Sequence, residues 1–121
     1  GCDPDLIVTV DNGIAAREEV SHLGERGIDV VVTDHHEPKQ GALPSAAAIV
    51  DPWREDDPCE FKEICGATVA WKVLLAYADK FADNGKKHAI NWLYLPQSAL
   101  FQIVCSCLTT IETLCGVVLL V

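Results

Sequence analysis

The stretch Val31-Val32-Thr33-Asp34-His35-His36 decides how this chain of 121 residues folds. Its β-branched residues favour a buried strand, and the strand pattern stops abruptly at an acid followed by two adjacent histidines. In open α/β sheets, ligands and metals bind at the carboxyl ends of the strands. The stretch therefore predicts a buried strand with a functional site at its end.

A second apolar stretch, Leu6-Ile7-Val8-Thr9-Val10, precedes this strand and also ends at an acid, Asp11. Residues 14–27 lie between the two strands and place apolar side chains at helical spacing, with Gly27 as a helix-ending residue. Parallel strands joined by a crossover helix are usually neighbours, so the order predicts a β-α-β unit. We expect an α/β fold, a parallel β-sheet with helices on both faces.

The β-α-β unit brings Asp11 and Asp34 to the same edge of the predicted sheet, next to His35 and His36. Carboxylate oxygens and neutral imidazole nitrogens together suit manganese, iron or zinc, whereas magnesium alone rarely recruits histidine. Simpler interpretations stay open, because an acid before Asn12-Gly13 is typical of a turn, and adjacent histidines are often hydrogen-bonded or exposed. The matching positions of the two acids favour a site.

Two further elements follow along the chain. Residues 46–50 predict a short third strand that ends at Asp51-Pro52, where Asp51 is interpreted first as a turn acid and second as a site residue. Residues 66–80 have the apolar spacing of a helix. Gly66-Ala67 at its start would allow another part of the backbone to approach closely.

Four ordered blocks lie between residues 5 and 81, and their sequences are Val10-Asp11-Asn12-Gly13, Val32-Thr33-Asp34-His35-His36-Glu37-Pro38, Ala48-Ile49-Val50-Asp51-Pro52 and Phe61-Lys62-Glu63-Ile64-Cys65-Gly66-Ala67-Thr68-Val69-Ala70-Trp71-Lys72. Their order and spacing closely resemble the DHH phosphoesterases, and most of all the RecJ-type single-strand-specific exonucleases. Four blocks in order are far more specific than an Asp-His-His tripeptide. The resemblance implies an incomplete DHH domain over residues 1–87.

The resemblance also implies a role for each candidate site residue. Asp11 and His35 match ligands of the catalytic metals, and His36 matches the histidine that contacts the scissile phosphate. Asp34 matches the acid that orients the two histidines, and we place it in both the catalytic and the metal-binding set. The implied cofactor is Mn²⁺ or Mg²⁺, with two ions in the complete site, which could activate a water and stabilise the attacking and leaving oxygens.

The expected function is metal-dependent phosphodiester hydrolysis by a cytoplasmic, RecJ-like exonuclease in DNA repair and recombination. Its partners would be single-stranded nucleic acid and replication or repair proteins. A small-substrate phosphoesterase, acting on pyrophosphate, oligoribonucleotides or a cyclic dinucleotide, stays open, and so does a non-catalytic scaffold. The block from Phe61 to Lys72 favours the exonuclease, and the four retained site residues argue against the scaffold. A net charge of −9 argues against a phosphate-tracking surface, but bound cations would neutralise substrate phosphate.

Residues 88–121 differ from the rest of the chain because Glu112 is their one formally charged side chain. A membrane span, a divergent part of the same domain and an out-of-frame sequence are the three interpretations. Burying Glu112 in a bilayer would cost about 2 kcal/mol or more, so no membrane partner is expected. Allowed codons for residues 98–103, read in a shifted frame, give Gly-Thr-Val-Ser-Asp, which resembles a motif of the family. We expect an atypical apolar tail, out of frame or divergent.

Some metal ligands implied by the resemblance are missing from this sequence. The family places an Asp-x-Asp strand ahead of Asp11 and a Gly-Thr-x-x-Asp segment after the helix predicted over 66–80. With neither, we expect weak metal binding and no activity from the chain alone. Its six cysteines show no zinc spacing pattern and are expected to be reduced thiols.

Overall fold

The structure, a computed structural model, describes residues 4–39, 43–81 and 117–120. Within these ranges the elements are β1 (Leu6–Val10), α1 (Arg17–Glu25), β2 (Asp29–Thr33), β3 (Ala48–Val50), α2 (Gly66–Phe81) and β4 (Val117–Leu120). The strands form one sheet in the order β3-β2-β1-β4, and all three pairings are parallel. The predicted α/β fold with a parallel sheet is confirmed.

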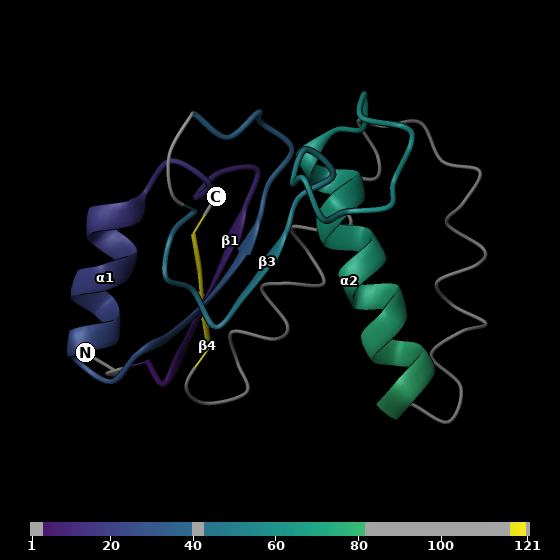
Figure 1. The fold of residues 1–121 in the computed structure, drawn as a ribbon. Helices are drawn as coiled ribbons and strands as arrows, with labels where there is room; N and C mark the ends of the chain where they lie inside the picture. The colour runs from purple at the N-terminus through teal and green to yellow at the C-terminus, as the bar shows by residue number, and fades with distance from the viewer. Residues whose placement is uncertain (1–3, 40–42, 82–116, 121) are drawn as a thin grey trace.

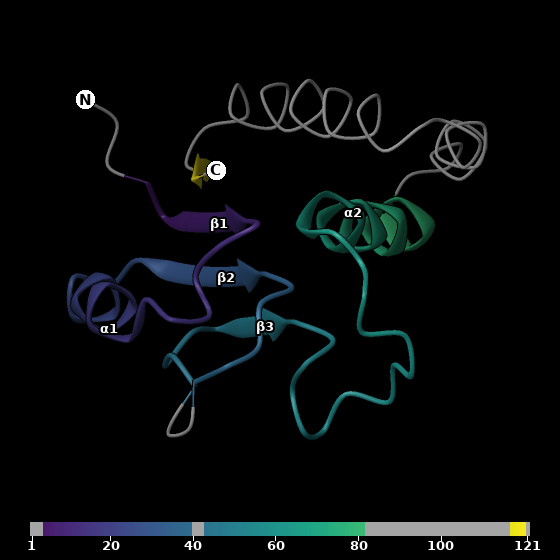
Figure 2. The ribbon, with the colours of Figure 1, turned by 90° about the horizontal axis from the view of Figure 1, so that it is seen from above.

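The register of β1 and β2 brings their carboxyl ends level with each other. Leu6 lies opposite Asp29 and Val10 lies opposite Thr33. The N–H of Asp11 donates to the carbonyl of Thr33 at 3.0 Å, which extends the ladder by one residue. In Figure 2 these strands run side by side in one direction, and the start of α2 lies beyond their ends. The acids that follow the two strands therefore meet at one edge of the sheet.

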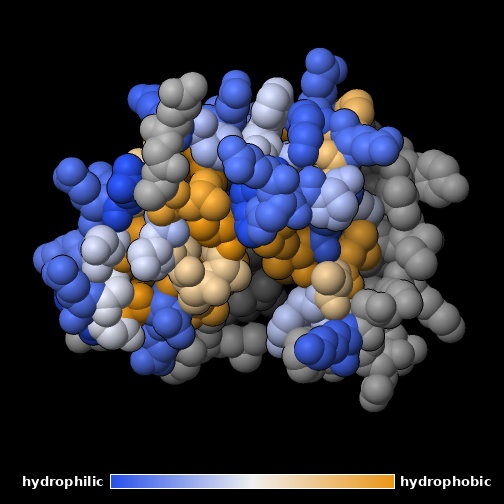
Figure 3. All heavy atoms as spheres, viewed as in Figure 1, coloured by the Kyte–Doolittle hydropathy of each residue, from blue (hydrophilic) through white to orange (hydrophobic). Residues whose placement is uncertain are grey.

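The two helices cover opposite faces of the sheet, as predicted (Figure 1). Alternate strand residues point to opposite faces, so the sheet contributes to two separate cores. The core under α1 contains Val20 with Ile7, Ile28, Val30 and Val32, and the core under α2 contains Ala70 and Trp71 with Val10. Figure 3 shows hydrophilic side chains over the outer side of α1 and over the loops at the top, with hydrophobic ones between α1 and α2.

The crossover helix is shorter than the predicted range 14–27, because α1 begins at Arg17 and ends at Glu25. Gly13, at φ 109°, starts a turn in which its carbonyl accepts the N–H of Ala16 at 3.0 Å. Ala16 itself has ψ 53°, outside the helical region. The third strand is also shorter than predicted, Ala48–Val50 instead of 46–50, and α2 ends at Phe81, one residue beyond the prediction.

Part of the predicted apolar tail joins the sheet as its edge strand β4. Leu6 lies opposite Val117 and Thr9 lies opposite Leu120. The remainder of the prediction for residues 88–121, including Glu112 and the stretch 98–103, lies outside the described residues. Among the helices described here, none combines the length and the apolar composition that a bilayer crossing requires.

Candidate metal centre

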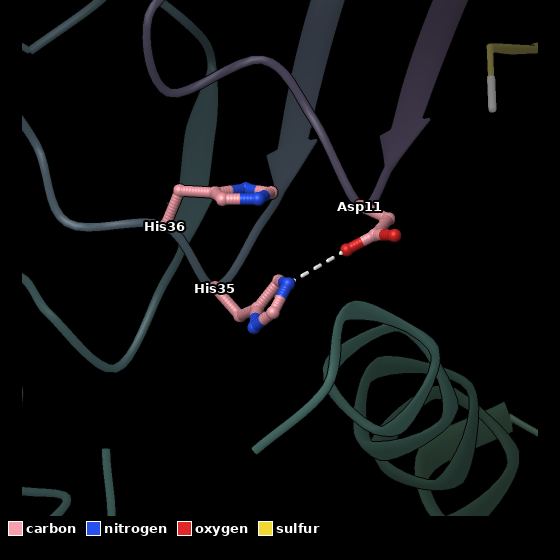
Figure 4. A group of neighbouring side chains, drawn as sticks. All are labelled: Asp11, His35 and His36. Carbon is pink, nitrogen blue, oxygen red and sulfur yellow. Dashed lines mark ion pairs between the residues drawn. The ribbon is translucent and has the colours of Figure 1, made fainter. Parts of the chain in front are cut away.

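Asp11 directly follows β1 and has a backbone conformation that few residues other than glycine adopt, with φ at 63°. Aspartate tolerates this left-handed conformation better than most side chains. The side chain is 44% exposed, and its Oδ1 lies 2.9 Å from Nε2 of His35. Figure 4 shows the Asp11 carboxylate and the His35 ring pointing toward each other from the ends of neighbouring strands.

Asp34 directly follows β2 but is buried, with 1% of its surface exposed. Its Oδ2 accepts the N–H of Ile14 at 2.9 Å, and its Oδ1 accepts the N–H of His35 at 2.8 Å. The same Oδ1 lies 2.6 Å from Nδ1 of His36. Asp34 therefore fixes the turn before α1 and the start of the histidine pair at the same time.

Hydrogen bonding sets the charge state of the Asp34–His36 pair. Burial alone would raise the pKa of Asp34, but hydrogen bonds from Ile14, His36 and His35 outweigh burial and hold this pKa below its ordinary value. The hydrogen bond to Asp34 raises the pKa of His36. Both shifts favour a carboxylate beside an imidazolium. Because Nδ1 of His36 faces Asp34, Nε2 is the ring nitrogen left for another partner.

Asp11, His35 and His36 form a group of possible metal ligands. One ligand atom from each residue lies within 4.8 Å of the other two, and the two imidazole centroids are 4.4 Å apart. A carboxylate with two imidazoles is a donor set that fits a divalent transition metal. Asp34 is not in this group, and both of its oxygens already have partners. A metal-binding role for Asp34 stays a prediction.

Asp51 directly follows β3 at the same edge of the sheet and is completely buried. Its Oδ1 accepts the N–H of Trp53 at 2.8 Å, the bond that a turn acid makes two residues ahead. Its Oδ2 has no hydrogen-bond partner among the described residues. Burial raises the pKa of Asp51, and the nearby charge of Asp34 raises it further. The acid that follows β3 is therefore buried, whereas the candidate metal ligands follow β1 and β2.

Two threonines and a glycine that the sequence did not single out hold the turn next to the site. Thr33 Oγ1 donates to the carbonyl of Thr9 at 2.6 Å, and Thr9 Oγ1 donates to the carbonyl of Asn12 at 2.8 Å. A Cβ on Gly13 would lie 2.7 Å from Thr9 Oγ1. The signal in the sequence was the threonine near the end of each apolar strand, where a hydroxyl can satisfy backbone groups of the turn.

Comparison with known proteins identifies what this chain is similar to. Residues 3–99 match the model of the DHH family, N-terminal domain. The single-stranded-DNA-specific exonuclease RecJ of Salmonella typhimurium is 46% identical over 82 residues, which are 66% of this chain and 14% of that protein. The proteins of the same name from Bacillus subtilis and Thermus thermophilus are 45% identical over 79 residues and 40% identical over 76 residues.

These alignments cover 65% and 63% of this chain, but 10% of the Bacillus protein and 11% of the Thermus protein. No solved structure matches the chain. The resemblance inferred from the four sequence blocks is confirmed by the family match and by the relatives.

Proposed function

This chain belongs to the DHH family, and on that premise we propose that Asp11, His35 and His36 are part of a divalent-metal site that hydrolyses phosphodiester bonds. The observation that carries the proposal is the grouping of their ligand atoms within 4.8 Å at the ends of two parallel strands. A cation bound there would make a water more acidic and neutralise charge on a phosphate. The proposed metal is Mn²⁺ or Mg²⁺, with two ions in the complete site.

The two histidines have different proposed roles. His35 pairs with the partly exposed Asp11 and would bind the cation with it. Nδ1 of His36 lies 2.6 Å from Oδ1 of Asp34, which leaves Nε2 to contact a phosphate oxygen beside the cation. We therefore assign the substrate phosphate to His36. Asp34 is the acid that orients both histidines, because its Oδ1 accepts the N–H of His35 and faces the ring of His36.

The proposed substrate is single-stranded DNA. The relatives that match this chain carry the name single-stranded-DNA-specific exonuclease, and their identity of 40% to 46% supports the transfer of that activity. The proposal concerns the whole protein, because the chain spans 14% or less of these relatives. We extend it to a cytoplasmic enzyme of DNA repair and recombination that meets replication or repair proteins.

The test is cleavage of labelled single-stranded DNA by the full-length protein that carries this sequence. We expect degradation with Mn²⁺ or Mg²⁺, little cleavage of a duplex of the same sequence, and none with a chelator. His35→Ala should lower the rate by about 100-fold. His22→Ala is the matched control, because His22 lies on α1 with 71% of its side chain exposed. Cleavage that persists in the chelator, or equal rates for the two variants, would refute the proposal.

A further inference from the structure

Gly66, the first residue of α2, lies directly against the side chain of Asp11. A Cβ built on Gly66 would overlap Oδ1 of Asp11 and would lie 2.6 Å from its Cβ and Cγ. Real Cβ atoms essentially never come within 3.0 Å of another heavy atom. No side chain therefore fits at position 66 while Asp11 keeps its place.

The glycine at position 66 is required by space and not by its backbone conformation. The described glycines with positive φ are Gly13 and Gly27, and Gly66 is not among them. It begins a regular helix, where the carbonyl of Cys65 accepts the N–H of Thr68 at 2.9 Å. Helix propensity favours alanine over glycine in such a position. The close approach of Asp11 explains why position 66 has glycine and not alanine.

Asp11 has little freedom to move away from α2. Its N–H is bonded to the carbonyl of Thr33 at 3.0 Å, and its φ of 63° already lies in a restricted region. The oxygen that a Cβ on Gly66 would displace is Oδ1, the same atom that lies 2.9 Å from Nε2 of His35. A side chain at position 66 would therefore move the Asp11 carboxylate away from His35, the residue with which it would bind the cation.

We propose that Gly66 is a positioning residue of the metal centre, whose missing side chain lets α2 hold the Asp11 carboxylate against His35. The part of this inference that concerns the cation rests on the proposed function. The packing of Gly66 against Asp11 does not, since it follows from the geometry alone. The two parts are tested separately.

The first experiment measures Mn²⁺ binding to the full-length protein that carries this sequence, by electron paramagnetic resonance of the free ion. Gly66→Ala should weaken binding by about tenfold or more. Gly24→Ala is the matched control, since Gly24 lies in α1 and a Cβ there would meet nothing within 4 Å. Absence of binding by the unchanged full-length protein would refute the proposed function. Equal binding by the unchanged protein and Gly66→Ala would overturn the inference about Gly66.

The second experiment is a double-mutant cycle on urea unfolding without metal. Asp11→Gly removes the three atoms that the new Cβ would meet, and glycine suits the φ of 63°. Gly66→Ala should raise the unfolding equilibrium constant by about tenfold beside Asp11, and by less than about twofold beside Asp11→Gly. If Gly66→Ala alone fails to fold, recovery of folding in the double variant supports the inference. Equal damage in both backgrounds overturns it.

Discussion

Two acid–histidine pairs stand at neighbouring strand ends, and they differ in burial. In the pair at the end of β1, Asp11 is 44% exposed and lies 2.9 Å from the 30% exposed side chain of His35. In the pair at the end of β2, the side chain of Asp34 is 2% exposed and lies 2.6 Å from His36, which is 59% exposed. Asp11 is therefore accessible to a ligand, whereas the oxygens of Asp34 are already hydrogen-bonded within the protein.

Residues of the same types therefore have two different roles within one site. Asp34 accepts backbone N–H groups from two separate segments, at Ile14 and at His35, so its loss should damage the fold. Asp11 is placed by its own backbone and by the space that Gly66 leaves, so its loss should damage binding. Changes to the two acids should therefore separate stability from metal affinity.

The largest expected effect on stability is that of Asp34→Ala. It would leave the amides of Ile14 and His35 without their acceptor, and we expect the free energy of unfolding to fall by about 3 kcal/mol. Asp11→Asn, the matched change at the open pair, should cost less than about 1 kcal/mol. Urea unfolding of both variants measures these two changes in the free energy of unfolding. Equal losses would show that the two acids do not differ as proposed.

Gly13→Ala should cost about 2 kcal/mol, because it combines a φ of 109° with a Cβ only 2.7 Å from Thr9 Oγ1 behind the buried pair. Gly27→Ala, at φ 76° with nothing within 4 Å, should show the backbone cost alone, about 1 kcal/mol. The difference between the two unfolding free energies isolates the contact with Thr9. A smaller loss at Gly13 than at Gly27 would contradict this packing.

Acid should remove the contribution of Asp34 to stability. Its pKa in the folded chain lies below the ordinary 3.8, so its contribution is present above about pH 4 and is lost as the pH falls through the folded value. Unfolding free energies of the unchanged chain and of Asp34→Asn, measured at several pH values, should therefore converge below about pH 4. A constant difference over that range would show that the pKa of Asp34 is not lowered.

The smallest effect is expected from the titration of His36. Its pKa lies above the ordinary 6.5, so its pairing stabilises the fold below about pH 6.5 and ceases to do so as the pH rises through the folded pKa. Exposure to solvent limits this contribution to about 0.5 kcal/mol or less. A nuclear magnetic resonance titration should show the pKa of His36 falling in Asp34→Asn. An unchanged pKa of His36 in this variant would show that Asp34 does not raise it.

The sequence was sufficient for the elements that repeat a simple pattern. The apolar run at residues 6–10 predicted β1 with its observed bounds, and parallel pairing with β2 then placed Asp11 and Asp34 at one edge. It was not sufficient for the turn at residues 14–16, because that turn depends on Gly13 and on the carboxylate of Asp34 from another strand.

The unequal burial of the two acids was also beyond the sequence. Both follow a strand of β-branched residues, and the local patterns are alike. Asp34 is buried because it meets the N–H of Ile14, twenty residues earlier in the chain. The place of Asp11 depends on Gly66, far along the chain at the start of α2. Such partners become visible only when the chain is folded.

The most direct test of the metal centre is a Mn²⁺ titration of the chain, followed through the histidine ring signals by nuclear magnetic resonance. The ion broadens signals of nearby nuclei, and His22 on α1 serves as an internal control because its exposed side chain lies outside the ligand group. We predict that the signals of His35 and His36 broaden first, and that Asp11→Asn shifts this broadening to higher Mn²⁺ concentration. Equal broadening of His22, His35 and His36, unaffected by Asp11→Asn, would contradict a metal centre at this edge of the sheet.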